Sequence, residues 1–191
     1  MTRVTTEALT FDNGRGDALA ARLERPEEGL RGFALFAPCF TCGKDHLAAV
    51  RISRRLATLG IATLRLDFTG LGDSAGEFGK AGFSDHVEDL KAAAAFTKSR
   101  GEAPSLLVGH SLGGAAVIAA APDIPSAQAV ATIGAPFDVE HVLEHFGSAL
   151  DKIESEGEAE VRLAGREFEV SEEFIAETRG HDQAARLRDL R

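Results

Sequence analysis

The strongest constraint on how this chain folds is an alternation of two apolar patterns between residues 33 and 133. Short, continuous apolar runs are typical of strands that are buried on both faces. The runs lie at 33–37, 61–66, 105–108 and 129–133. Segments with apolar residues at helical spacing separate them, at 45–59, 85–100 and 115–121. Because parallel neighbouring strands need a crossover connection, usually a helix, the alternation predicts an α/β fold: a mostly parallel sheet with helices on both faces.

The segments on either side of this core break the alternation. Before it, two alternating stretches flank the turn Asp12-Asn13-Gly14, which predicts an N-terminal hairpin. After Pro136, residues 161–170 alternate around a glycine turn, and Ser171 is placed to cap a short helix. We therefore predict one domain over residues 1–191. It comprises a core at 1–136, a lid-like insertion at 137–180 and the start of a core helix at 181–191.

The sequence Gly109-His110-Ser111-Leu112-Gly113 matches the pattern G-x-S-x-G, and its context makes the match informative. It follows an apolar strand and opens a helix of small residues, as a nucleophile elbow requires. Glycines flank the serine because the sharp turn leaves no room for a Cβ atom. The turn presents the Ser111 hydroxyl at the carboxyl end of the sheet, in front of a helix N-terminus that favours negative charge. Ser111 is therefore the candidate nucleophile.

Charge and the N-terminal residues limit the partners and the compartment. A net charge of −9 and a pI near 5.2 disfavour nucleic acid, which binds through cations, and an anionic membrane surface. No apolar run approaches the length of about 20 residues that a membrane span needs. The N-terminal residues lack the apolar region of a secretory signal, so a cytoplasmic location is expected.

Residues 34–136 resemble the α/β-hydrolase superfamily in four segments. The segments are 36–45, 64–74, 109–114 and 133–136. Together they are similar to the hydrolase domain that precedes an OsmC-like domain in some bacterial proteins. The resemblance implies an α/β-hydrolase fold and a serine hydrolase of the esterase or acyl-hydrolase type, acting on a small ester or acyl substrate without a cofactor or metal. In the second segment, Asp67 and Asp73 flank a glycine turn and are expected to fix its geometry.

The resemblance also implies an oxyanion hole made of two backbone N–H groups. One belongs to Leu112, the residue after the nucleophile. Spacing along the loop after the first core strand assigns the other to Phe40. In the superfamily this loop usually reads His-Gly, whereas this chain has Pro38-Cys39. The difference concerns the geometry of the loop and not the presence of a backbone donor.

The superfamily orders its catalytic groups as serine, acid, histidine. The strands that should carry the acid and the histidine are expected to begin where this sequence ends, at Arg191. None of His141, His145 and His181 follows a buried strand. A serine without a base is a weak nucleophile at neutral pH, so the chain by itself is expected to be inactive or weak. Three explanations are open, and the first is favoured: a fragment of a longer enzyme, groups supplied by a partner such as an OsmC-like domain, or a protein that is no longer catalytic.

Two other functions are open. One is a non-catalytic α/β-hydrolase-like module that binds a ligand or partner, because fold alone does not establish function. The other is a thiol-redox protein, because Cys39 and Cys42 have C-x-x-C spacing, although buried and unreactive thiols are the favoured interpretation. The segment His141-Val142-Leu143-Glu144-His145 matches a zinc pattern, but zinc is disfavoured because no third ligand stands out.

Overall fold

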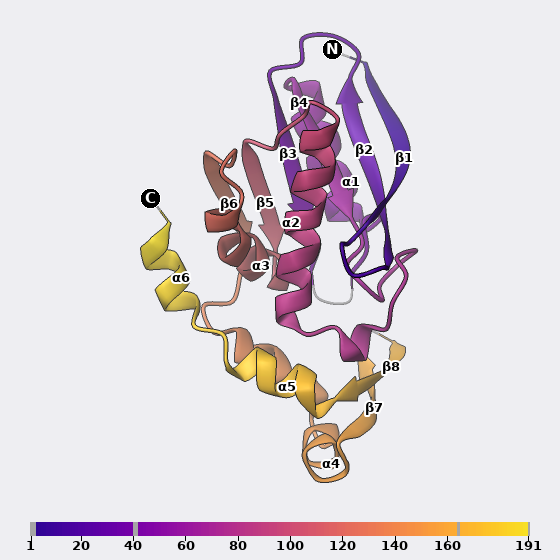
Figure 1. Cartoon of the computed structure of the whole chain (residues 1–191). Coiled ribbons are helices and arrows are strands. Elements are labelled where there is room, and N and C mark those ends of the chain that lie inside the picture. The colour runs from indigo at the N-terminus through magenta and orange to yellow at the C-terminus, as the bar shows by residue number, and fades with distance from the viewer. Residues whose placement is uncertain (1–2, 40–41, 164, 191) are drawn as a thin grey trace.

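The computed structural model describes residues 3–39, 42–163 and 165–190. Its centre is a six-stranded sheet in the order β1-β2-β4-β3-β5-β6 (Figure 1). The last four strands in this order pair in parallel, whereas β1 and β2 pair antiparallel. The strands are β1 (Val4–Asp12), β2 (Ala18–Pro26), β3 (Gly32–Ala37), β4 (Ile61–Leu66), β5 (Leu106–His110) and β6 (Ala129–Ile133). The predicted mostly parallel sheet is confirmed, with the N-terminal hairpin at one edge.

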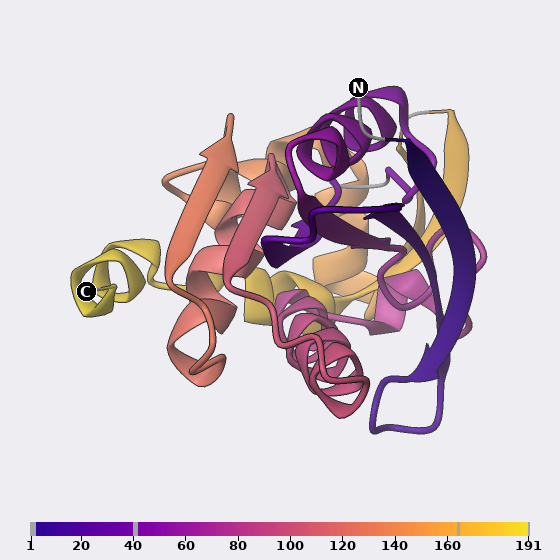
Figure 2. The same cartoon turned by 90° about the horizontal axis from the view of Figure 1, so that it is seen from above.

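Helices cover both faces of the sheet, as predicted. α1 (Leu47–Thr58) lies on one face and α2 (Phe83–Ser99) on the other (Figure 2). α3 (Leu112–Ala120) packs on α2 and β5. All nine residues of α3 are buried, which explains why this helix is apolar and small on every side. None of the described helices combines the length and apolarity that a membrane span requires.

Three adjacent parallel strands contribute a fully buried layer of leucines to the core. Leu35 of β3 is in register with Leu64 of β4 and with Leu107 of β5, and all three side chains are fully buried. Truncating one of them to alanine would cost about 2–5 kcal/mol, because a cavity would replace packed core. This layer fixes the carboxyl ends of the strands, from which the loops of the candidate site emerge.

β6 is exposed, which corrects the prediction of a fourth strand buried on both faces. It pairs with β5 only and forms the edge of the sheet. Four of its five residues are exposed, including Ile133 at 40%. An apolar run predicts a strand, but it carries no information about whether other elements cover that strand. Here α3 packs against β6 but leaves only Val130 half-buried.

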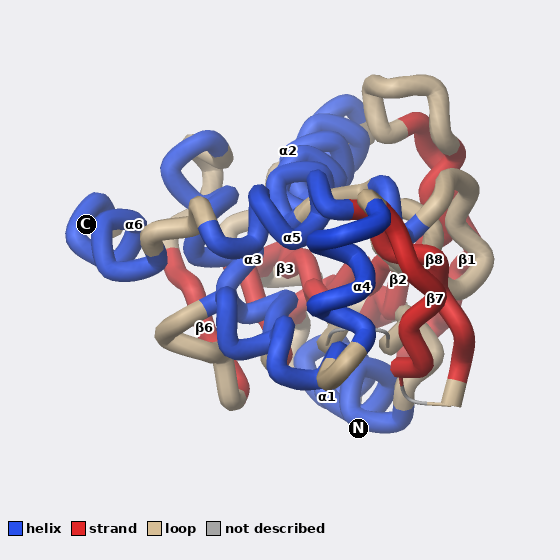
Figure 3. Tube along the Cα trace, turned by 90° about the horizontal axis from the view of Figure 1, so that it is seen from below, coloured by secondary structure: helices blue, strands red, loops and turns tan. Residues whose placement is uncertain are grey.

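The segment after Pro136 forms a small substructure of its own. It contains the two-stranded sheet and the short helix at Ser171 that the sequence predicts. In Figures 1 and 3 this substructure lies beyond the carboxyl ends of β3 and β5. Whether it acts as a lid, and the division at residues 136 and 180, stay predictions. Its elements are η3 (Val139–Phe146), α4 (Ala149–Glu156), β7 (Glu158–Leu163), β8 (Arg166–Ser171) and α5 (Glu172–Arg179). The helix that follows, α6 (Gln183–Asp189), packs on α3 instead.

Two 3-10 helices of three residues each lie in connections between core elements. They are η1 (Phe78–Lys80) and η2 (Ala121–Asp123). η1 packs against β8, and the ring centroids of Phe78 and Phe168 are 4.7 Å apart. This apolar contact ties the C-terminal substructure to the core.

Candidate active site

Ser111 lies at the sharp turn between β5 and α3, where the sequence places it. Its backbone has φ 53° and ψ −126°, and no other non-glycine residue among those described has a positive φ. Such a conformation costs about 1–3 kcal/mol and persists only where its surroundings enforce it. The Ser111 N–H donates to the Ile133 carbonyl at 2.9 Å, and the Gly114 N–H donates to the Ser111 carbonyl at 2.8 Å. The turn leaves Ser111 partly exposed at the carboxyl end of the sheet.

Two glycines make this turn sterically feasible. A Cβ atom on Gly109 would overlap the Gly113 carbonyl. A Cβ atom on Gly113 would overlap the Pro38 carbonyl oxygen and lie 2.6 Å from that of Ala37. The elbow therefore packs directly, backbone against backbone, on the loop that follows β3.

Of the two residues assigned to the oxyanion hole, Leu112 is described by the structure and Phe40 is not. Leu112 is the first residue of α3, where a backbone N–H has no acceptor within the helix. An N–H group in this position can donate to negative charge that develops beside Ser111. Phe40 lies outside the described residues. The roles of Leu112 and Phe40 stay predictions.

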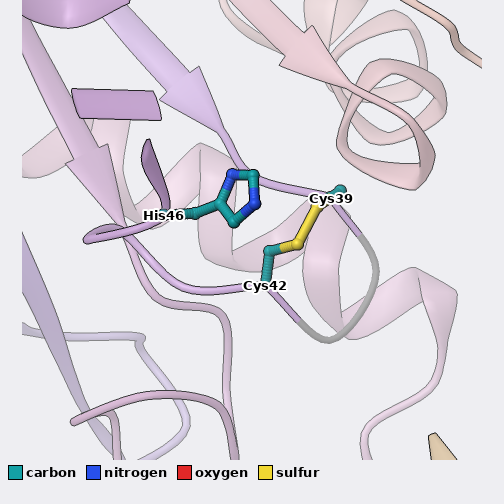
Figure 4. A group of neighbouring side chains, drawn as sticks. All are labelled: Cys39, Cys42 and His46. Carbon is teal, nitrogen blue, oxygen red and sulfur yellow. A yellow bond between two sulfur atoms is a disulfide. The ribbon is translucent and has the colours of Figure 1, made fainter. Parts of the chain in front are cut away.

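The first loop, residues 38–46 after β3, contains a disulfide between Cys39 and Cys42 (Figure 4). The Cα atoms are 5.1 Å apart, and the Cys42 N–H donates to the Cys39 carbonyl at 2.9 Å. Both cysteines are partly exposed. The interpretation as buried, unreactive thiols is therefore wrong: C-x-x-C spacing allows a bond here because a tight turn brings the two side chains together.

The same two cysteines and His46 form a potential metal-ligand cluster. The two sulfurs and one ring nitrogen lie within 4.8 Å of one another. The metal ligand, however, is the thiolate and not the disulfide sulfur. In the oxidised form that the structure describes, the cluster therefore does not offer three metal ligands.

The second loop, residues 67–76 after β4, is organised by the buried carboxylate of Asp67. It accepts hydrogen bonds from the Lys44 N–H, from the Lys44 ammonium at 2.8 Å and from the Asp73 N–H at 2.9 Å. Lys44 is itself buried and also donates to the exposed Asp73 carboxylate at 2.6 Å. Asp67 and Asp73 thus fix the loop as expected. The role of Lys44 was not predicted, because nothing in the sequence pairs it with an aspartate 23 residues away.

Protonation of this cluster follows from its geometry. Burial by itself would lower the pKa of Lys44, but its hydrogen bonds to Asp67 and Asp73 raise that pKa above the ordinary value. The hydrogen bond from Lys44 lowers the pKa of Asp73. The Lys44 ammonium therefore joins the two loops through its hydrogen bonds to Asp67 and Asp73.

No histidine among the described residues forms a hydrogen bond with the Ser111 hydroxyl. The rings of His46 and His110 are stacked with centroids 6.4 Å apart. His181 instead contacts Gln183 through Nε2 at 2.9 Å.

The zinc-like segment at His141 and His145 lies in a 3-10 helix and not in an α-helix. Three residues per turn do not align positions four apart, and the two rings meet edge-on at 6.4 Å. His141 instead contacts Glu144 at 3.1 Å on the surface. The segment lines a pocket of about 450 Å³ beside Phe137 and Arg179, and Ser111 is not part of its lining.

Comparison with known proteins identifies the family and the fold. A sequence model of the family described as serine aminopeptidase, S33, matches residues 44–156. A comparison with curated proteins gives no match. Among solved structures, the esterase domain of a Rhodothermus marinus protein is 45% identical, with a TM-score of 0.74. That alignment covers 98% of this chain and 73% of the other.

Two more distant structures share the fold. Est1E from Butyrivibrio proteoclasticus, solved with ferulic acid bound, is 21% identical with a TM-score of 0.76, over 94% of this chain and 73% of that one. Alpha/beta hydrolase domain-containing protein 10 from mouse is 23% identical with a TM-score of 0.67, over 90% and 69%. The family match spans more than half of the chain. The sequence identity of 45% to the Rhodothermus marinus domain is far above the level at which only the fold is shared. The chain therefore belongs to the serine aminopeptidase S33 family and has the α/β-hydrolase fold.

Proposed function

We propose that the protein is a serine hydrolase of the esterase or acyl-hydrolase type, with Ser111 as its nucleophile. The observation that carries this proposal is the backbone of Ser111, which is held at φ 53° between a strand and a helix. Strain of this kind persists where function requires it, and here it presents a hydroxyl in front of the N-terminus of α3. The 45% identity to a domain named as an esterase supports the same reaction class.

The proposed reaction proceeds through an acyl-serine. Ser111 Oγ attacks the carbonyl carbon of an ester or thioester while a base takes its proton. The N–H groups of Leu112 and Phe40 stabilise the oxyanion, and the alcohol or thiol leaves with the proton. Water then hydrolyses the acyl-serine, which releases a carboxylic acid and restores the serine.

We propose that the base and the acid that orients it come from outside the described residues. No described histidine bonds to Ser111, and the alignment leaves about a quarter of the Rhodothermus marinus esterase domain uncovered. A C-terminal segment or an OsmC-like partner domain would supply the two groups. The chain by itself is then inactive or weak, because the oxyanion hole and substrate binding give only residual catalysis.

A small ester or acyl compound is the proposed substrate, and the cytoplasm the proposed location. Est1E, which shares the fold, binds ferulic acid, a small carboxylic acid. The pocket at His141 does not include Ser111, so its shape does not indicate which acyl group Ser111 would accept.

Covalent labelling tests the proposal directly. The protein at the length found in its native cells is treated with a fluorophosphonate, and the intact mass and the labelled peptide are measured. One adduct at Ser111, absent in Ser111→Ala and retained in Ser155→Ala, is expected; Ser155 is an exposed serine on α4 and serves as the matched control. Labelling of Ser111→Ala at the wild-type rate would show that another residue is the nucleophile. No adduct at native length would leave a non-catalytic binding module.

A further inference from the structure

We propose that the Cys39–Cys42 disulfide is a thiol–disulfide exchange site whose oxidation state controls how fast Ser111 reacts. Its substrate is a protein with a reactive dithiol. The exchange site stands by itself, whereas the control of Ser111 rests on the function proposed above.

The disulfide lies where a backbone change reaches the elbow. Cys39 directly follows Pro38, whose carbonyl oxygen occupies the space that a Cβ atom on Gly113 would need. Gly113 is two residues from Ser111 in the turn. Because this contact joins two backbones without a side chain between them, movement at Cys39 displaces the turn that holds Ser111.

The bond is accessible and is a weak structural cross-link. Both cysteines are partly exposed, so a thiolate can approach the sulfurs. The bond joins residues only three apart, and the stabilisation that a cross-link gives grows with the length of the loop it closes. The far end of the first loop is already anchored through Lys44 and Asp67. The bond is therefore better placed for exchange than for holding the fold together.

Two neighbouring groups favour the opening of the bond. The His46 ring lies beside the sulfurs, with ligand atoms within 4.8 Å (Figure 4). α1, which has 12 residues, begins directly after His46, and the His46 side chain does not cap it. A ring N–H that donates to the sulfur and a helix N-terminus both stabilise a thiolate, and a stable thiolate is the better leaving group.

The exchange balances with the dithiol as the reductant. One thiolate of the partner attacks a sulfur of the pair, the Cys39–Cys42 bond breaks, and a mixed disulfide forms. The second thiol of the partner then displaces the protein thiolate and closes the partner's own disulfide. Two electrons and two protons pass from the partner to Cys39 and Cys42, which become free thiols.

Reduction removes the covalent constraint on the loop that packs on the elbow. The oxidised form therefore holds the turn in its reactive geometry, and the reduced form relaxes it. Misplacing an oxyanion donor costs a serine hydrolase up to about 100-fold, so a partial displacement should slow Ser111 about tenfold.

The experiment compares the native chain in its two oxidation states. The protein is incubated with reduced thioredoxin as the dithiol probe, alkylated with iodoacetamide without denaturant, and weighed by mass spectrometry. We expect two alkyl groups, fluorophosphonate labelling of Ser111 about tenfold slower, and faster amide exchange at residues 109–114. Reoxidation of the reduced protein with diamide before alkylation should prevent the alkylation and restore the labelling rate and the amide exchange. The double variant Cys39→Ser/Cys42→Ser should not respond to the reductant. His46→Ala should slow reduction, whereas His145→Ala, an exposed histidine far along the chain, should not.

Two results would overturn the proposal. If the cysteines are alkylated only after denaturation, the reductant does not open the bond in the folded protein, and the bond is purely structural. Reduction that leaves both the labelling rate and the amide exchange of 109–114 unchanged would separate the cysteines from the elbow. A chain that is never labelled at Ser111 but shows native reduction and altered amide exchange would overturn the serine hydrolase and leave the exchange site standing.

Discussion

The two loops that leave β3 and β4 lie at the same end of the sheet but are held by different chemistry. The first loop is closed on itself by the Cys39–Cys42 disulfide. The second loop is closed by a buried carboxylate, Asp67, that binds backbone N–H groups and an ammonium. Lys44 belongs to the first loop and binds the second, so the two are joined at one point.

The comparison of the two loops shows which restraint at the site lasts as long as the fold and which can be removed. The ion network forms together with the fold, because Lys44 and Asp67 are buried and satisfy each other. A disulfide depends on the redox environment as well as on the fold. The part of the first loop that contacts the elbow is restrained by the disulfide. Reduction can therefore remove this restraint without unfolding the sheet.

Replacing Gly113 by alanine should have the largest effect, because it breaks the contact between the first loop and the elbow. The added Cβ atom would overlap the Pro38 carbonyl oxygen, which is backbone and cannot rotate away. We expect a loss of about 4 kcal/mol in the free energy of unfolding, measured by urea denaturation, with loss of Ser111 labelling. Gly32→Ala is the matched control, since its nearest atom is a serine hydroxyl at 3.4 Å. Equal effects of the two would mean that the close approach is not what positions the elbow.

Replacing Asp67 by alanine should come second, because it removes the centre of the second loop. The buried Lys44 ammonium would keep only the exposed carboxylates of Asp73 and Asp45 as close partners, and two backbone N–H groups would lose their acceptor. Breaking a buried ion pair in this way costs about 3 kcal/mol. Asp73→Asn leaves Asp67 and Lys44 paired and should change the urea midpoint far less. A larger effect of Asp73→Asn would mean that the exposed contact is the one that closes the loop.

Lowering the pH should destabilise the protein through a buried histidine that packs against the second loop, before it affects the disulfide of the first loop. His86 of α2 is fully buried against Phe68, with ring centroids 4.6 Å apart, and burial lowers its pKa to about 4. Between the ordinary pKa of about 6.5 and this value the unfolded chain binds the extra proton, so stability falls as the pH falls. The expected loss from pH 7 to 4.5 is about 2 kcal/mol.

A variant separates His86 from other titrating groups. Burial raises the pKa of the neighbouring Asp89, and a raised carboxyl pKa makes stability increase as the pH falls, which is the opposite sign. The difference between wild type and His86→Leu therefore isolates the histidine. Urea midpoints for His86→Leu should depend less steeply on pH between 6.5 and 4.5. An unchanged slope would show that His86 is not buried as a neutral ring.

The sequence predicts the strands, the helices and the elbow because their signals are local. The apolar run before Gly109, the small residues after Ser111 and the spacing of the glycines all lie within a few positions of one another. The exposure of β6, the ion pair of Lys44 with Asp67 and the packing of Pro38 on Gly113 were not predicted, because each depends on residues that only the folded sheet brings together. The disulfide lies between these two cases. The sequence shows the C-x-x-C spacing, but the bond itself depends on the turn that brings the two cysteines together.

Opening the disulfide should have the smallest effect on stability, even though it alters the elbow. The chain-entropy contribution of a bond that closes so short a loop is about 2 kcal/mol at most, and part of it is offset where the loop is otherwise restrained. Reduced and oxidised protein should therefore differ by about 1 kcal/mol in urea unfolding, less than Asp67→Ala. Combining reduction with Asp67→Ala tests whether the loops support each other: because Lys44 belongs to the first loop and binds the second, the two losses should not add. Strict additivity would mean that the covalent and the ionic restraints act on the elbow independently.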